Sequence, residues 1–250
     1  MPPNTESALS VHDESGTSSR REAKPAYSRA WRSYSAIAVG GWLLLLAIVI
    51  PLGLLITGPL ADSWLTRADE RLPERWENAR TATLNSWTVW ASGMGETVTV
   101  VSIASIVGIA LLMMRRWGAA LLLATAMVLE VTAFVVTTLF VERDRPDVHQ
   151  LDVSPPTSSY PSGHTAASFA LYATLALLVT LHTRSIVARV CAWTLAVAAA
   201  LTVGAARIYR GMHHPSDVLA GLLVGAACVT IAFLAVRAWD RVELLREVSE

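Results

Sequence analysis

The sequence predicts an all-α fold: an integral membrane six-helix bundle, with an interfacial helix between spans one and two. Of the 250 residues, 53% are hydrophobic, and the mean hydropathy is +0.45. Only 16% are charged, against roughly 25% in soluble domains. Several apolar runs approach the roughly 20 residues that a helix needs to cross a bilayer.

The chain divides into three regions by composition. Residues 1–33 are polar and end in a basic segment, so we expect a disordered N-terminal tail. Residues 34–240 are expected to form the six-span domain, and residues 241–250 a charged C-terminal tail. A cleaved signal peptide is not expected, because the first apolar run starts late and continues too long.

The first span is predicted at residues 36–56, with Pro51 kinking it or marking its exit. Residues 59–95 then mix acidic, basic and aromatic side chains, which predicts a short amphipathic helix on the membrane interface. The tryptophans of this segment, which form either an interfacial belt or an aromatic cage, are Trp64, Trp76, Trp87 and Trp90.

The remaining spans follow from the apolar runs between polar connections. They are predicted at residues 96–114, 118–141, 163–181, 190–205 and 216–236. A polar connection that contains prolines, residues 142–162, joins the third span to the fourth. Cys191 and Cys228 both lie inside apolar runs, so we interpret them as small buried hydrophobes rather than a disulfide or metal pair.

The distribution of basic residues predicts the orientation. With both termini in the cytoplasm, twelve of the 20 Lys and Arg residues lie on the cytoplasmic side and eight on the other, which agrees with the positive-inside rule. We therefore expect a multi-pass protein of the cell membrane with both termini inside. Nucleic-acid binding is not expected, since 20 acidic residues balance the basic ones and no basic stripe is present.

Three polar motifs lie at the ends of the predicted spans. The first is R-D-R-P at residues 143–146, the second P-S-G-H at residues 161–164, and the third A-R-I-Y-R-G-M-H-H-P-S-D at residues 206–217. In six alternating spans all three emerge on one face, which is the outer face if the termini are cytoplasmic. Such a density of charge beside apolar runs is typical of a functional site.

Together the motifs predict a phosphate site. Two helix N-termini present unpaired N–H groups and positive dipole ends there. Ser162 and Gly163 suit a bound oxyanion, because glycine lets the backbone approach closely. Arg145 and Arg207 can add bidentate contacts to the same anion.

Two histidines can supply the chemistry at this site. His213 lies four residues before Asp217, whose carboxylate can accept one imidazole N–H and leave the other ring nitrogen free as a nucleophile. His164 can then protonate the departing oxygen. The alternative is a solvated loop in which Asp217 only caps a helix.

These motifs resemble those of the type 2 phosphatidic acid phosphatases, the lipid phosphate phosphatases related to vanadium haloperoxidases. That family's pattern is K-x6-R-P, P-S-G-H and S-R-x5-H-x3-D, and the resemblance covers roughly residues 96–236. It implies hydrolysis without a metal or other cofactor, in which His213 forms a phosphohistidine, Asp217 orients it and His164 is the general acid. The phosphate-binding residues that it implies are Arg145, Arg207, Ser162 and Gly163.

Two positions differ from the family's pattern. Thr138 stands where the family has a phosphate-binding lysine, and Ala206 stands where it has serine; the only lysine of the chain is Lys24, in the N-terminal tail. Losing one charged hydrogen bond costs about 1.5–3 kcal/mol. We hypothesise that Arg210 supplies the missing positive charge, with Arg143 as the alternative.

Three further features allow more than one interpretation. His214 beside His213 suggests a metal site, with His149, Asp147 and Asp152 as further ligands, but adjacent side chains usually point apart and the spacing matches no zinc or two-metal site. We therefore expect no metal.

Glu130 is an ionisable residue in the middle of the third span, about 12 Å deeper than Thr138 along a straight helix. It is either a neutral or hydrogen-bonded residue packed against another span or a polar contact that supports the floor of the site. The loop of residues 155–159 is either a semi-rigid lid or a connection stiffened by prolines.

The sequence thus predicts a membrane phosphatase that cleaves the phosphate monoester or diphosphate of a lipid outside the cytoplasm. Candidate substrates are polyprenyl diphosphates, phosphatidic acid and phosphatidylglycerol phosphate. The missing lysine motivates an alternative, a catalytically weak relative that binds or transports anionic lipid. Vanadate-dependent oxidation is a third hypothesis, which six membrane spans argue against.

Overall fold

The computed structural model describes residues 15–154 and 156–247, and within these ranges it has eight helices and no strands. They are α1 (Ser15–Thr57), α2 (Trp64–Asn78), α3 (Ala82–Gly93), α4 (Thr97–Met113), α5 (Trp117–Phe140), α6 (Gly163–His182), α7 (Ile186–Tyr209) and α8 (Pro215–Glu247). The predicted all-α fold is confirmed.

Five of these helices are long and apolar enough to cross a membrane: α1 from Ser28, then α5, α6, α7, and α8 as far as Trp239. Helices α3 and α4 meet that criterion together, as one span bent by 42° at a short break. Large apolar side chains such as Leu44 and Leu139 are exposed on the outside of the bundle, where lipid covers them. The protein is therefore a multi-pass membrane protein.

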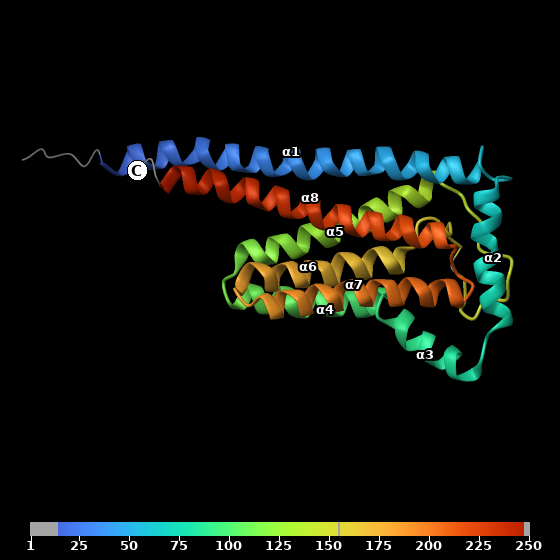
Figure 1. The fold of residues 1–250 in the computed structure, drawn as a ribbon. Helices are drawn as coiled ribbons and strands as arrows, with labels where there is room; N and C mark the ends of the chain where they lie inside the picture. Colours follow the sequence, from blue (N-terminus) through green and yellow to red (C-terminus); the bar gives the residue numbers. More distant parts are fainter. Residues whose placement is uncertain (1–14, 155, 248–250) are drawn as a thin grey trace, which may run out of the picture.

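The arrangement of the helices brings four helix ends to one place (Figure 1). Helices α1 and α8 lie side by side, and α8 also packs on α5 and α6. Helix α2 crosses the end of the bundle where α5 and α7 finish and where α6 and α8 begin. The N-terminal end of α1 and the C-terminal end of α8 lie at the opposite end of the molecule.

The segment expected to form one interfacial helix, residues 59–95, forms two helices. Helix α2 is amphipathic and buries Asp69 and Pro73. Helix α3 has no charged residue, and it continues into the bent span with α4.

The predicted tails are also helical where the structure describes them. Helix α1 already begins at Ser15 and continues through Pro51, and α8 extends to Glu247, since an existing helix adds further residues at little cost. Residues 1–14 and 248–250 of the expected tails lie outside the described residues. Cys228 is buried as predicted, but Cys191 is exposed on α7.

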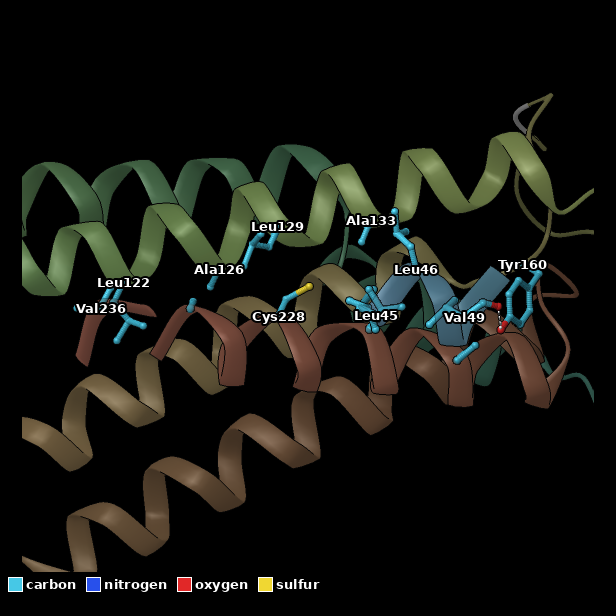
Figure 2. Close-up of a cluster of buried hydrophobic side chains, with 14 of the residues drawn as sticks. Leu45, Leu46, Val49, Leu122, Ala126, Leu129, Ala133, Tyr160, Cys228 and Val236 are labelled. Atoms are coloured by element: carbon cyan, nitrogen blue, oxygen red, sulfur yellow. Dashed lines mark hydrogen bonds between the residues drawn. The ribbon is translucent and has the colours of Figure 1, made fainter. Parts of the chain in front are cut away.

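A buried apolar cluster joins α1, α5 and α8 and ends beside the second motif (Figure 2). Leu46 and Val49 of α1 pack in this cluster with Ala133 of α5. The hydroxyl of Tyr160 donates a hydrogen bond of 3.0 Å to the carbonyl of Val49. This bond fastens the connection before α6 to α1.

Glycines of α8 allow α6 and α8 to cross closely. A Cβ atom at Gly221 would lie 2.5 Å from the carbonyl oxygen of Ser162, and one at Gly225 would lie 2.7 Å from that of Ala166. Small residues permit such backbone contacts between membrane helices. The close crossing sets the beginning of α6, with the second motif, directly beside the beginning of α8.

Candidate active site

A cavity of about 1280 Å³ begins among the three motifs and extends between α4 and α5. Its polar end is lined by Arg145, Asp152, Gly163, His164, Arg207, Arg210 and His213. Ser162 and Asp217 are fully buried behind that lining. The structure thus brings together the residues that the sequence analysis selected.

His213 is held by a backbone carbonyl rather than by Asp217. Its Nδ1 lies 2.8 Å from the carbonyl oxygen of Ser159. A carbonyl can only accept a hydrogen bond, so Nδ1 carries the proton and Nε2 keeps its lone pair. The nearest Asp217 oxygen is 3.8 Å from Nδ1, too far for a hydrogen bond. Burial lowers the pKa of His213, and the charge of Asp217 opposes this shift only in part.

Asp217 instead organises the backbone and side chains around His213. Its carboxylate accepts hydrogen bonds from Arg143 (2.5 Å), the Ser159 hydroxyl (2.5 Å) and the backbone N–H of His214 (2.8 Å). Its own carbonyl accepts the N–H of Ser162 at 2.9 Å. Asp217 therefore joins the first and third motifs through its carboxylate and the second through its backbone carbonyl.

Arg143 connects this carboxylate to α2. Its Nη1 donates to Asp217 and to the Ser216 hydroxyl (2.6 Å), and its Nη2 lies 2.8 Å from Asp69. Burial alone would lower the pKa of Arg143, but the two carboxylates outweigh burial and raise it. Its donors are thus engaged away from the cavity, which disfavours the hypothesis that Arg143 replaces the missing lysine.

The two helix N-termini differ in their availability. At α6 the Ser162 hydroxyl pairs with Thr165 and makes no capping bond, so the first N–H groups of α6 stay free for an anion. At α8 the N–H and hydroxyl of Ser216 both donate to Asp69. Only the α6 terminus is therefore available to a phosphate.

Gly163 leaves room for the ring of Phe134 at this position. A Cβ atom there would lie 2.9–3.2 Å from three ring atoms of Phe134. Beside it, Arg145 donates to the carbonyl of Met212 at 2.7 Å. Burial lowers the pKa of Arg145, and Asp217 opposes the shift. Arg145 also lines the cavity.

Arg207 carries the clearest unused donor of the site. Its Nη1 donates to the Ser92 hydroxyl (3.0 Å) and to Asp152 (2.9 Å), whereas its buried Nε has no hydrogen-bond partner among the described residues. An unpaired buried donor costs about 1–3 kcal/mol. This Nε is enclosed by protein atoms rather than open to the cavity, so a phosphate would reach it only through a movement of the guanidinium.

Arg210, the hypothesised replacement for the lysine, is largely occupied. It forms a bidentate ion pair with Asp152 at 2.8 and 2.5 Å. It also donates to Thr88 of α3 (3.2 Å) and to two carbonyls. Burial alone would raise the pKa of Asp152, but Arg210 and Arg207 outweigh burial and lower it. Arg210 lines the cavity, yet Asp152 already neutralises much of its charge.

His164 follows Gly163 in the first turn of α6 and lines the cavity with His213. In the described part of the chain, its imidazole has no hydrogen-bond partner. It is therefore free to exchange a proton with a ligand in the cavity.

The histidines considered for a metal site make other contacts. His214 lies between Asp217 (3.1 Å) and Glu70 (2.9 Å), and the exposed His149 uses only its backbone, with Glu77 and Arg80. Within residues 15–154 and 156–247, no group of three His, Cys, Asp or Glu side chains is placed to hold a metal ion.

Three peripheral features contribute little to the polar end. Thr138 donates its hydroxyl to the carbonyl of Val135 and does not line the cavity. None of the tryptophans of α2 and α3 lines it either, which argues against an aromatic cage. Of the possible lid, Thr157 and Ser158 line the cavity, whereas Pro155 lies outside the described residues.

Several contacts of the site were not predicted from the sequence. Asp69 contacts Ser216 from 147 residues away and belongs to no motif, so no local signal identifies it. The Ser159 carbonyl is equally invisible in a side-chain pattern. Asp152 was considered only as a metal ligand, although an acidic residue in a loop between arginine-containing motifs is a signal for an ion pair.

Comparisons with known proteins agree with the fold and with the family that the sequence resembles. A family model described as the PAP2 superfamily matches residues 117–241. The chain is similar to a PAP2-type phosphatidylglycerolphosphate phosphatase from Bacillus subtilis, with a TM-score of 0.65 and 22% identity over 79% of this chain and 94% of that one. It is also similar to Aquifex aeolicus LpxE, with a TM-score of 0.53 and 26% identity over 65% of this chain and 93% of that one. No curated protein matches.

Proposed function

Because the chain belongs to the PAP2 superfamily, we propose that it is a membrane phosphatase. Its substrate is a lipid phosphate monoester or diphosphate, and its intermediate is a phosphohistidine. The observation that carries the proposal is the single cavity in which His213, His164, Arg145 and Arg207 meet the free N-terminus of α6. Cations and a helix N-terminus can stabilise a phosphoryl group, and two imidazoles can act as its nucleophile and general acid.

In the first step His213 is the nucleophile. Its Nε2 attacks phosphorus while the Ser159 carbonyl holds the Nδ1 proton. A P–N bond forms as the bond between phosphorus and the lipid oxygen breaks, and His164 gives that oxygen its proton. The leaving group is a lipid alcohol for a monoester and a lipid monophosphate for a diphosphate.

In the second step water takes the place of the lipid. His164, now neutral, accepts a proton from the attacking water, the P–O bond forms and the P–N bond breaks. Orthophosphate leaves, and both histidines return to their starting states. Arg145, Arg207 and the N–H groups of α6 neutralise the phosphoryl oxygens in both steps.

The shape of the cavity supports a lipid substrate. Beyond its polar end, the lining from α4 and α5 is mostly apolar. Val101 of α4 and Val131 of α5 both line the cavity and are about half exposed. A lipid can therefore present its headgroup to the histidines while its tails remain between α4 and α5 and in the bilayer.

The site is proposed to face the outside of the cell. It lies at the end of the bundle opposite the N-terminal end of α1 and the C-terminal end of α8 (Figure 1). The bias of twelve against eight basic residues favours cytoplasmic termini, which puts the site on the extracytoplasmic face.

Phosphate release by the purified protein tests this proposal. Phosphatidic acid, phosphatidylglycerol phosphate and a polyprenyl diphosphate are supplied in mixed micelles with EDTA present. We expect orthophosphate from at least one of them, inhibition by orthovanadate and no release by His213→Ala. His164→Ala should be slower by about 10²–10⁴-fold, whereas His149→Ala, an exposed loop variant, should match wild type.

The same assay addresses the second candidate, a protein that binds or transports anionic lipid without hydrolysis. Thr138 in place of lysine, and Arg210 already paired with Asp152, are the observations that favour it. Saturable lipid binding with no phosphate release, unchanged in His213→Ala, would support that candidate and reject the phosphatase.

A further inference from the structure

Glu130 is the one ionisable side chain that lines the apolar part of the cavity within the described residues. It belongs to the middle of α5 and is 4% exposed. All other ionisable residues of the lining lie at helix ends or in the connection before α6: Glu96, Arg145, Asp152, His164, Arg207, Arg210 and His213. The polar group of Glu130 is thus separate from the phosphate site.

The carboxyl group of Glu130 interacts electrostatically with the buried thiol of Cys228 on α8 but is otherwise without a partner in the described part of the chain. Among the described residues it makes no hydrogen bond and no ion pair. Its neighbours one turn away on α5 are apolar: Ala126, Met127, Ala133 and Phe134. A carboxylate buried without a cation or donor is strongly disfavoured, so the site accommodates the neutral acid, which carries one O–H donor.

The depth of Glu130 can be related to the phosphate site through Phe134. The Phe134 ring lies against Gly163, at the N-terminus of α6, and therefore at the level of the bound phosphate. Glu130 is four residues earlier on the same helix, which is about 6 Å deeper along the axis. A group that meets Glu130 thus belongs to the first few bonds of the lipid beyond its phosphate.

Lipid phosphates differ in their chemistry at that depth. A diacylglycerol phosphate carries ester carbonyls a few bonds beyond the phosphorus, and these are good hydrogen-bond acceptors. A polyprenyl chain carries only hydrocarbon beyond its phosphates. A buried O–H that finds no acceptor is a penalty for the complex, so Glu130 can distinguish the two classes.

We infer that Glu130 donates a hydrogen bond to an ester carbonyl of a bound diacylglycerol phosphate and is a specificity-determining residue for glycerol-ester lipids. This inference rests on the proposed phosphatase function. It assigns to α5 a role that the three motifs do not contain.

A pair of substrates that differ only in the carbonyls provides the test. Diacylglycerol phosphate and its dialkyl ether analogue, with equal chain lengths, are compared by kcat/KM in the same micelles. Wild type should prefer the diester roughly fivefold to tenfold, the effect of one neutral hydrogen bond. Glu130→Gln, whose amide still donates, should keep most of the preference, whereas Glu130→Leu should lose it.

Met127→Leu is the matched control, since Met127 lines the same cavity one turn away and offers no donor. It should keep the wild-type preference. Equal rates of wild type on the two lipids, or an equal loss on both in Glu130→Leu, would overturn the inference and leave Glu130 a packing residue. A selective loss on a polyprenyl diphosphate would also overturn it. Wild type that releases phosphate from no lipid would instead reject the proposed function.

Discussion

Asp152 occupies the two arginines of the third motif. Its carboxylate lies 2.9 Å from Arg207 and 2.5 Å from Arg210, and it is held on the connection before α6. A phosphate that binds to Arg207 must share or displace this carboxylate. In the absence of substrate, the ion pairs keep both arginine side chains in place. When substrate is bound, the carboxylate of Asp152 competes with the phosphate for them.

Asp152→Asn is therefore expected to tighten the binding of an anion. The affinity for orthovanadate, measured as an inhibition constant for phosphate release, should rise about fivefold, or about 1 kcal/mol. Asp147→Asn is the control, because it removes the same charge from an exposed position of the same connection. Weaker or unchanged inhibition in Asp152→Asn would show that Asp152 orders the arginines rather than competing with the ligand.

The environment of His213 predicts a pH profile. Burial lowers its pKa, so the neutral, nucleophilic form persists below the ordinary value of about 6.5. The acid limb of kcat/KM should therefore lie below pH 6.5. Asp217→Asn removes a charge that raises the pKa of His213 and should move the limb to lower pH.

Comparing the pH profiles of wild type and Asp217→Asn separates the titration of the enzyme from that of the substrate. The phosphate of the substrate titrates identically with both proteins. A limb that lies above pH 6.5 in wild type, or one that moves upward in Asp217→Asn, would contradict this account of His213.

At the scale of helices, the sequence predicted the features that depend on the local pattern of apolar and polar residues. Apolar runs located the spans, and their alternation brought residues 143–146, 161–164 and 206–217 to one end of the bundle. It did not predict contacts that depend on how distant elements meet. Arg143 and Asp69 are 74 residues apart, and their ion pair exists because α2 folds across the helix ends.

The same distinction applies within the site. Asp217 and His213 were correctly placed near each other by their spacing, but which acceptor holds the imidazole depends on the path of the connection before α6. There the Ser159 carbonyl oxygen lies closer to Nδ1 than the carboxylate of Asp217 does. A side-chain motif carries no information about a backbone acceptor from another segment.

The close crossing of α6 and α8 predicts the effect of Gly221→Ala. The added Cβ would meet the Ser162 carbonyl at 2.5 Å, and a backbone atom cannot move aside cheaply. We expect the free energy of unfolding to fall by about 1–3 kcal/mol and phosphate release to fall with it, because Ser162 begins the anion-binding turn.

Gly40→Ala is the matched control for thermal unfolding in detergent and for phosphate release. Gly40 lies on α1, where an added Cβ atom would meet nothing within 4 Å, and alanine favours a helix by about 0.5–1 kcal/mol over glycine. This variant should be as stable as wild type or more stable. Equal behaviour of the two variants would mean that α6 and α8 can separate without consequence for the site.

The whole molecule combines an apolar exterior with a polar site at one end, so its direction in the membrane decides which side of the membrane the site faces. Two exposed histidines mark the opposite ends: His149 in the connection before α6, and His182 at the end of α6. In a background without Cys191 and Cys228, we expect a membrane-impermeant maleimide to label His149→Cys on intact cells.

His182→Cys should react only after the cells are permeabilised, because the positive-inside bias puts the connection between α6 and α7 in the cytoplasm. Labelling of both variants after permeabilisation shows that each thiol is accessible. The reverse pattern would put the histidines and arginines of the site inside the cell. The lipid phosphates available to the enzyme would then be those of the cytoplasmic leaflet, while the chemistry at His213 would stay the same.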